Sequence, residues 1–136
     1  MTLTVTGAVY AEMIAHARAD HPIEACGVLI GIGARSDYAD RAIAMVNVEQ
    51  SATCFRFEAA AQLAVWQDAE DQGEQVIAVY HSHTATEAYP SGTDIAYAAD
   101  PDVRYVVIST ADGDELRVFR IVDGTITEED WTIDEP

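Results

Sequence analysis

The order of apolar and polar positions divides the chain into helical and extended segments. Apolar residues at helical spacing, with polar residues between them, predict amphipathic helices over residues 8–20 and 58–72. Pro22 and Gly73 follow these segments and predict where the helices end. A short third helix is predicted at about 92–99. Apolar runs of strand length predict strands over residues 2–5, 27–33, 42–48, 55–57, 76–80, 104–109, 115–122 and 125–133.

Turn residues connect the last predicted strands. Asp112-Gly113 and Asp123-Gly124 are strong hairpin signals, and residues 34–40 are expected to form a loop. Helices before and between strands, followed by hairpins, predict an α/β (α+β) fold in which helices flank a central mixed β-sheet. No repeat or linker interrupts the 136 residues, so we predict one domain, residues 1–136.

The same pattern assigns helical side chains to the core or the surface. The second helix carries an apolar stripe around Trp66, which we expect in the core. The members of the stripe are Ala61, Leu63, Ala64, Val65 and Ala69. His16 and His21 lie near the end of the first helix, where cations are favourable, so both are expected on the surface.

The apolar strand at 76–80 leads into polar residues with the spacing of a metal site. His81-x-His83 follows it directly, and Ser91 and Asp94 come after a short polar loop. Because side chains alternate along a strand, the two histidines point to the same side, with Cα atoms about 6.5 Å apart. Two imidazoles and one carboxylate leave one position of a tetrahedral zinc ion open, as in catalytic zinc sites.

These residues also have purely structural interpretations. A single histidine is often a packed or exposed residue, and Ser91-x-x-Asp94 is also a capping box for the third helix. The two roles are compatible, because a helix N-terminus can hold a carboxylate rigidly. A buried strand that carries both histidines to its carboxyl end, where α/β sheets place their sites, favours the metal site.

The motif resembles that of the JAMM (MPN+) zinc metalloproteases. The resemblance rests on His81-x-His83-x7-Ser91-x2-Asp94 and on the upstream Glu24 in PIEACGVLIG, and it covers nearly the whole chain. The stretch HSHTATEAYPS is most similar to the bacterial Mec-type enzymes, which are sulfur-carrier-protein cysteine hydrolases. Thr84 stands where many members have proline, which favours this subgroup and changes no ligand.

The resemblance implies a fold, a cofactor and a reaction. The fold is a three-layer sandwich related to the cytidine deaminases, and Zn²⁺ is held by His81, His83 and Asp94. Glu24 is implied as the general base, and Ser91 as a hydrogen-bond donor to the metal-bound water or to the oxyanion. The reaction is hydrolysis of the C-terminal peptide bond of a ubiquitin-like sulfur-carrier protein with a diglycine tail, which releases cysteine for cysteine biosynthesis.

Other functions share parts of this sequence pattern. A JAMM isopeptidase would remove ubiquitin-like tags or trim sulfur-carrier tails. A non-catalytic MPN binding module is disfavoured because every matching ligand position is present. A deaminase lacks its paired-cysteine zinc motif, and a cysteine protease at Cys26 lacks a base oriented on the thiol. Residues 84–90 border the motif and either contact the tail or simply connect the strand to the helix.

Composition limits which partners and which cellular location are expected. The net charge is −17, from 24 acidic and 7 basic residues, so the chain repels nucleic acid and anionic membranes. We interpret the acidity as a solvated surface; selection of a partner with a basic face is the weaker alternative. No apolar stretch would span a bilayer and the N-terminus lacks a basic start, so a cytoplasmic location is expected. Cys26 and Cys54 are expected as small buried hydrophobic residues.

Overall fold

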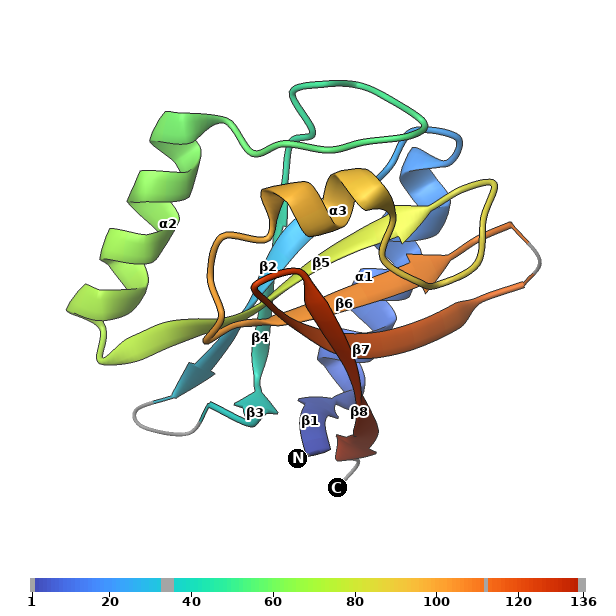
Figure 1. Cartoon of the computed structure of the whole chain (residues 1–136). Helices are drawn as coiled ribbons and strands as arrows, with labels where there is room; N and C mark the ends of the chain where they lie inside the picture. The colour runs from blue at the N-terminus through green and yellow to red at the C-terminus, as the bar shows by residue number, and fades with distance from the viewer. Residues whose placement is uncertain (1, 33–35, 112, 135–136) are drawn as a thin grey trace.

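The computed structural model describes residues 2–32, 36–111 and 113–134, which form three helices and eight strands (Figure 1). The elements in chain order are β1 (Thr2–Thr6), α1 (Gly7–Asp20), β2 (Cys26–Ile32), β3 (Tyr38–Ala39), β4 (Arg41–Met45), α2 (Ala59–Asp71), β5 (Glu74–His83), α3 (Gly92–Tyr97), β6 (Arg104–Ser109), β7 (Glu115–Val122) and β8 (Thr125–Asp134). The strands make one mixed sheet in the order β3-β1-β8-β7-β6-β5-β2-β4.

Strand β5, which ends in the two motif histidines, lies inside this sheet. It pairs antiparallel with β2, where Cys26 is opposite His81 and Gly27 is opposite Tyr80, and it pairs parallel with β6 on its other edge. A side chain at Gly27 would not fit, because its Cβ would lie 2.4 Å from the Tyr80 ring and 2.5 Å from the Ile43 carbonyl oxygen. The absence of a side chain at Gly27 therefore allows this close approach, and β5 is held on both edges.

Helices cover both faces of the sheet, as expected. Leu29 and Tyr80 pack against α1 in the largest apolar cluster. Because side chains alternate along a strand, Val28 and Ile30 point to the opposite face, where they meet Ala69 of α2. Figure 1 shows α1 behind the sheet and α2 and α3 in front of it. The result is a three-layer α+β arrangement whose front layer also carries the motif aspartate.

The predicted elements agree closely with the structure except where pairing is long-range. Residues 34–40 contain the short strand β3, which pairs parallel with β1, so the expectation of a loop there was wrong. The expected strand at 55–57 is reduced to one isolated bridge between Asn47 and Phe57. Gly33, residues 34–35 and Asp112 lie outside the described residues. Asp123 and Gly124 both have positive φ, 51° and 78°, and make the expected turn between β7 and β8.

Helix α2 is more exposed than its apolar stripe predicts. Of the stripe, Ala69 is buried and Val65 is half-buried, whereas Leu63 is 59% exposed. Helical periodicity identifies residues that share a face, but it does not say how much of that face meets the sheet. His16 was expected on the surface; instead it is half-buried, with its Nδ1 2.7 Å from the hydroxyl of Tyr80. No described helix is long and apolar enough to cross a membrane.

Candidate metal centre

His81, His83 and Asp94 converge at the end of β5. The Nε2 atoms of the two histidines are 3.1 Å apart, and Oδ2 of Asp94 is 3.0 Å from each of them. Both imidazoles are buried, and the side chain of Asp94 is only 8% exposed. Three potential ligand atoms from two elements thus face one point, as the spacing of the motif predicts.

The third ligand is positioned by the capping box at the start of α3. The Ser91 hydroxyl accepts a hydrogen bond from the Asp94 N–H at 3.1 Å, and the Ser91 N–H donates to Asp94 Oδ2 at 2.9 Å. The predicted capping box is confirmed. Because Oδ2 is also the atom that faces the histidines, the cap and the candidate metal site share one carboxylate oxygen.

The histidine rings are oriented from outside the site. Nδ1 of His83 lies 2.9 Å from the carbonyl oxygen of Glu87 and is the donor there, since a carbonyl only accepts; this leaves a lone pair on Nε2 for a metal. The ring of Phe55 stacks on His81, with centroids 4.5 Å apart and an interplanar angle of 22°. Burial lowers the pKa of His81, so this imidazole is neutral near pH 7.

The donor set fits a small dication. Burial opposes ionisation of Asp94, but in the metal-free site Nε2–H groups of His81 and His83 donate to it and hold its pKa well below the usual range, so it is a carboxylate. A metal would take the place of these protons. Two lone pairs and a carboxylate oxygen within 3.1 Å repel one another unless a proton or a cation lies between them. A tetrahedron with metal bonds of 2.0–2.1 Å has edges of about 3.3 Å, close to the separations here. Nitrogen and carboxylate donors are ligands that zinc accepts.

Glu24 is buried just before β2, and the residue after it is hydrogen-bonded to β5. Its residue is 3% exposed, and Oε1 has no hydrogen-bond partner among the described residues. Burial raises the pKa of Glu24 to about 7, the positive charge of His83 lowers it, and the negative charge of Asp94 raises it. The next residue, Ala25, donates its N–H to Ser82 Oγ at 2.8 Å. The structure therefore places a carboxyl group that titrates near neutrality within the electrostatic reach of the candidate metal site.

The contacts that several residues make around the site carry no signal in the sequence. Ser82 was only the spacer between the histidines, yet it anchors the segment that carries Glu24. The hydroxyl of Thr84 donates to the carbonyl oxygens of Pro22 at 3.2 Å and Ala52 at 3.4 Å, so it joins two loops beside the site. Asn47 and Phe55 come from two segments, 42–48 and 55–57, that the sequence predicts only as strands. Their contacts span long sequence separations, which no local pattern records.

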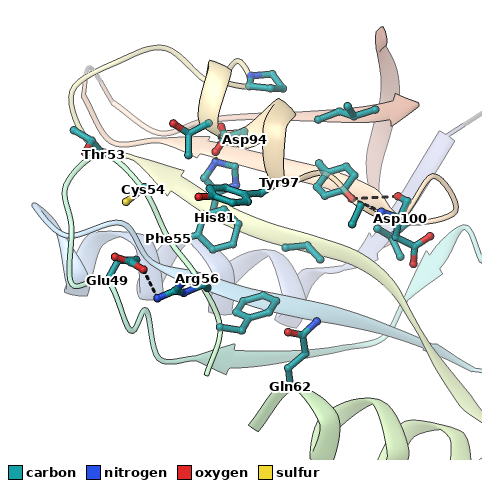
Figure 2. A pocket seen from close by; sticks show the side chains of 18 of the residues that line it. Glu49, Thr53, Cys54, Phe55, Arg56, Gln62, His81, Asp94, Tyr97 and Asp100 are labelled. Carbon is teal, nitrogen blue, oxygen red and sulfur yellow. Dashed lines mark hydrogen bonds and ion pairs between the residues drawn. The ribbon is translucent and has the colours of Figure 1, made fainter. Parts of the chain in front are cut away.

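A cavity of about 610 Å³ opens beside the ligands (Figure 2). His81 and Asp94 line one part of it, and aromatic side chains line much of the rest. These aromatic residues are Phe55, Phe57, Trp66, Tyr97 and Tyr105. Trp66, expected in the core, thus packs on the sheet and also lines the cavity. Of residues 84–90, Pro90 lines the cavity and the Glu87 carbonyl orients His83, while contact of this loop with a carrier tail stays a prediction.

The two cysteines differ in environment. Cys26 is buried, as expected, and burial together with the negative charges of Asp20 and Glu24 raises its pKa to about 12. Its thiol lies 3.8 Å from the Met45 carbonyl oxygen. A protonated buried thiol is a poor nucleophile, which argues against a cysteine protease. Cys54 was also expected to be buried, but it is half-buried and lines the cavity.

Comparisons with known proteins agree with this geometry. The family model described as prokaryotic homologs of the JAB domain matches residues 6–122. The chain is 55% identical over 119 residues to the CysO-cysteine peptidase of Mycobacterium tuberculosis, covering 86% of this chain and 81% of the relative. It is 29% identical over 129 residues to the desampylase of Haloferax volcanii, covering 91% of this chain and 84% of the relative.

Solved structures show the same fold. The solution structure of a protein from Desulfitobacterium hafniense superposes with a TM-score of 0.88 at 33% identity, over 99% of this chain and 94% of that one. Together with the family match, this confirms the three-layer fold with a mixed central sheet that the resemblance implied. The chain therefore belongs to the prokaryotic JAB-domain family, within the JAB/MPN group that its motif resembles.

Proposed function

We propose that this protein is a zinc-dependent peptidase that hydrolyses the C-terminal peptide bond of a ubiquitin-like sulfur-carrier protein and so releases cysteine. The observation that carries the proposal is the convergence of His81, His83 and Asp94 beside an open cavity, in a chain 55% identical to a CysO-cysteine peptidase. All the groups that the reaction needs lie in what we propose is one domain, residues 1–136. The cytoplasmic location stays a prediction from the sequence.

In this proposal His81, His83 and Asp94 hold the zinc ion. When bound, zinc supplies Lewis acidity toward a carbonyl oxygen and favours the ionisation of water. Glu24 accepts the proton of the attacking water and returns it to the leaving amine. Burial raises its pKa to about 7 in the zinc-free protein, and the charge of a bound zinc ion would lower it. A buried carboxyl group beside the site that can gain and lose a proton supports this role.

Ser91 is proposed to stabilise the oxyanion of the tetrahedral intermediate. A hydroxyl that accepts one hydrogen bond still has its own proton to donate, and the Ser91 hydroxyl accepts from the Asp94 N–H. Its position next to a ligand supports the assignment. Loss of one such donor typically costs about 3 kcal/mol at the transition state.

The carrier tail is proposed to lie extended in the cavity. A diglycine tail has no side chains, so it can pass between flat aromatic walls such as those of Phe55 and Tyr97. Net charge −17 disfavours an anionic partner, and the tail-bearing protein is expected to present a neutral or basic face.

A broader isopeptidase that removes ubiquitin-like tags is the second candidate. It is favoured by the similarity to a desampylase, but at 29% identity against 55% for the cysteine-releasing relative. A non-catalytic binding module is disfavoured, because the ligands converge and a buried carboxyl lies close to them.

Mass spectrometry tests the proposal directly. The substrate is a ubiquitin-like carrier that ends in diglycine followed by one cysteine, incubated with zinc-loaded protein. We expect the loss of one cysteine residue, no loss after treatment with EDTA, and little turnover by Glu24→Gln although it keeps zinc. An unchanged mass with zinc-loaded protein would exclude cysteine release, and a diglycine-linked lysine substrate would then test the isopeptidase.

A further inference from the structure

Asn47, just after β4, is a buried polar residue that lies outside the metal motif. It is 4% exposed, and its side chain makes four hydrogen bonds. Nδ2 donates to the carbonyl oxygens of Glu24 and Cys54, both at 3.0 Å, and Oδ1 accepts the N–H groups of Glu49 at 3.0 Å and Arg56 at 3.2 Å. A primary amide has two donor hydrogens and two acceptor lone pairs, so the amide is fully used.

These bonds join the proposed general base to one wall of the cavity. The bond to the Glu24 carbonyl holds the backbone of the base. The bonds to Cys54 and Arg56 hold the residues on either side of Phe55, whose ring stacks on His81. Asn47 therefore supports Glu24 directly, through the bond to its carbonyl oxygen. It supports His81 indirectly, because it bonds to both neighbours of Phe55 (Figure 2 shows Cys54, Phe55 and Arg56 around His81).

Among the described residues, few other hydrogen bonds restrain Glu24. Its N–H donates to the Ser51 carbonyl oxygen at 2.9 Å, and Oε1 has no partner among the described residues. The position of the carboxyl group therefore depends on how its backbone is held from both sides. The Glu24 N–H is held by Ser51 and the Glu24 carbonyl by Asn47. Ser82 holds the N–H of the next residue, Ala25.

We infer that Asn47 is a positioning residue that aligns the Glu24 carboxyl with the His81, His83 and Asp94 site. The inference rests on the proposed function, since it takes Glu24 as the base. It assigns catalytic importance to a residue that touches neither the ligands nor the cavity, because a small displacement of a catalytic group lowers turnover strongly.

The test is a set of variants assayed on the carrier with one added cysteine. Asn47→Ala is expected to lower kcat about 10- to 100-fold. Its zinc content and the absorption spectrum of its cobalt-substituted form should match those of the unaltered protein. Gln50→Ala is the matched control, because Gln50 donates to the backbone carbonyl of Asn47 at 2.6 Å and is exposed. This control should keep kcat near that of the unaltered protein.

A double variant separates positioning of the base from a general structural role. If Asn47 acts through Glu24, Asn47→Ala adds little further loss of kcat in the Glu24→Gln background. Three outcomes would each overturn the inference without affecting the proposed function. The first is an equal fold loss of kcat from Asn47→Ala in the unaltered protein and in the Glu24→Gln background. The others are a normal kcat in folded, zinc-loaded Asn47→Ala and the loss of its cobalt spectrum. Full turnover by Glu24→Gln would instead overturn the proposed base, and this inference with it.

Asn47→Asp is the second variant, should the alanine variant fail to fold. It keeps acceptor oxygens for the Glu49 and Arg56 N–H groups and removes the Nδ2 donor to Glu24. The results expected for the kcat, zinc content and cobalt spectrum of Asn47→Ala apply to this variant too. A normal kcat in this variant would show that the bond to Glu24 does not position the base.

Discussion

At the scale of single residues, the burial of Glu24 has a thermodynamic consequence apart from catalysis. Burial raises its pKa from 4.5 to about 7, with a lowering contribution from His83 and a raising one from Asp94. Below pH 4.5 the carboxyl is protonated in both the folded and the unfolded chain. Between pH 4.5 and about 7 only the folded protein keeps the proton, so stability due to this group falls as the pH rises through that window.

Glu24→Gln should therefore remove this pH dependence from the zinc-free protein. Glutamine does not titrate, so relative to wild type the variant should gain stability as the pH rises from below 4.5 to above 7. The gain should reach at most about 3 kcal/mol. Urea unfolding in EDTA at several pH values measures it. Parallel stability curves for the two proteins would contradict the buried, titrating Glu24.

At the scale of secondary-structure elements, α3 depends on its first turn. It has six residues, none of which is buried as a whole, and such a short helix is not stable alone. The box formed by Ser91 and Asp94 supplies both its cap and the third ligand. The helix and the metal site therefore stabilise each other through one carboxylate.

Loss of the α3 cap should weaken zinc binding even when no substrate is present. Ser91→Ala removes a bond worth about 1 kcal/mol, so we expect zinc affinity to fall about 5-fold. Glu58→Ala is the matched control, because Glu58 caps α2 by accepting the Ala61 N–H at 2.5 Å and lies outside the metal site. Competition with a zinc-binding dye measures both. Equal zinc affinity in the two variants would show that the cap does not hold Asp94.

At the scale of the whole molecule, the dominant feature is charge. A net charge of −17 on 136 residues opposes the compact state through self-repulsion. Some acidic residues are paired, such as Glu128 with Arg117 and Glu129 with both Arg104 and Arg120. Seven basic residues cannot neutralise 24 acidic ones, so ion pairs offset only a small part of the repulsion between acidic side chains.

Added salt should therefore stabilise the zinc-free protein. Salt screens both the repulsion among the acidic residues and the attraction within exposed ion pairs. The repulsion should be the larger effect, because each exposed ion pair is worth only about 0–1 kcal/mol. The urea midpoint is expected to rise between low and moderate concentrations of sodium chloride. Tetramethylammonium chloride should act similarly if screening rather than sodium binding is the cause. A falling midpoint would mean that the ion pairs outweigh the repulsion.

Much of the candidate site could be predicted because its parts are close in sequence. His81 and His83 share a strand face by alternation, and Ser91 and Asp94 share a helical turn, so local geometry already brings each pair together. The order of helices and strands predicted helices flanking a central mixed sheet, and the resemblance to the JAMM metalloproteases implied the three-layer sandwich. The pattern was less informative for Leu63 and His16, whose exposure depends on how their helices meet the sheet.

The sequence by itself determined the strand that carries the histidines, the capped helix that carries Asp94, and most element boundaries, because periodicity and turn chemistry act over a few residues. Only the tertiary structure decided that Asn47 bonds to Glu24, that Ser82 anchors Ala25, and that Phe55 stacks on His81. These contacts join residues 23 or more positions apart. Such pairs meet only when the sheet assembles, and they impose no periodic pattern on the chain.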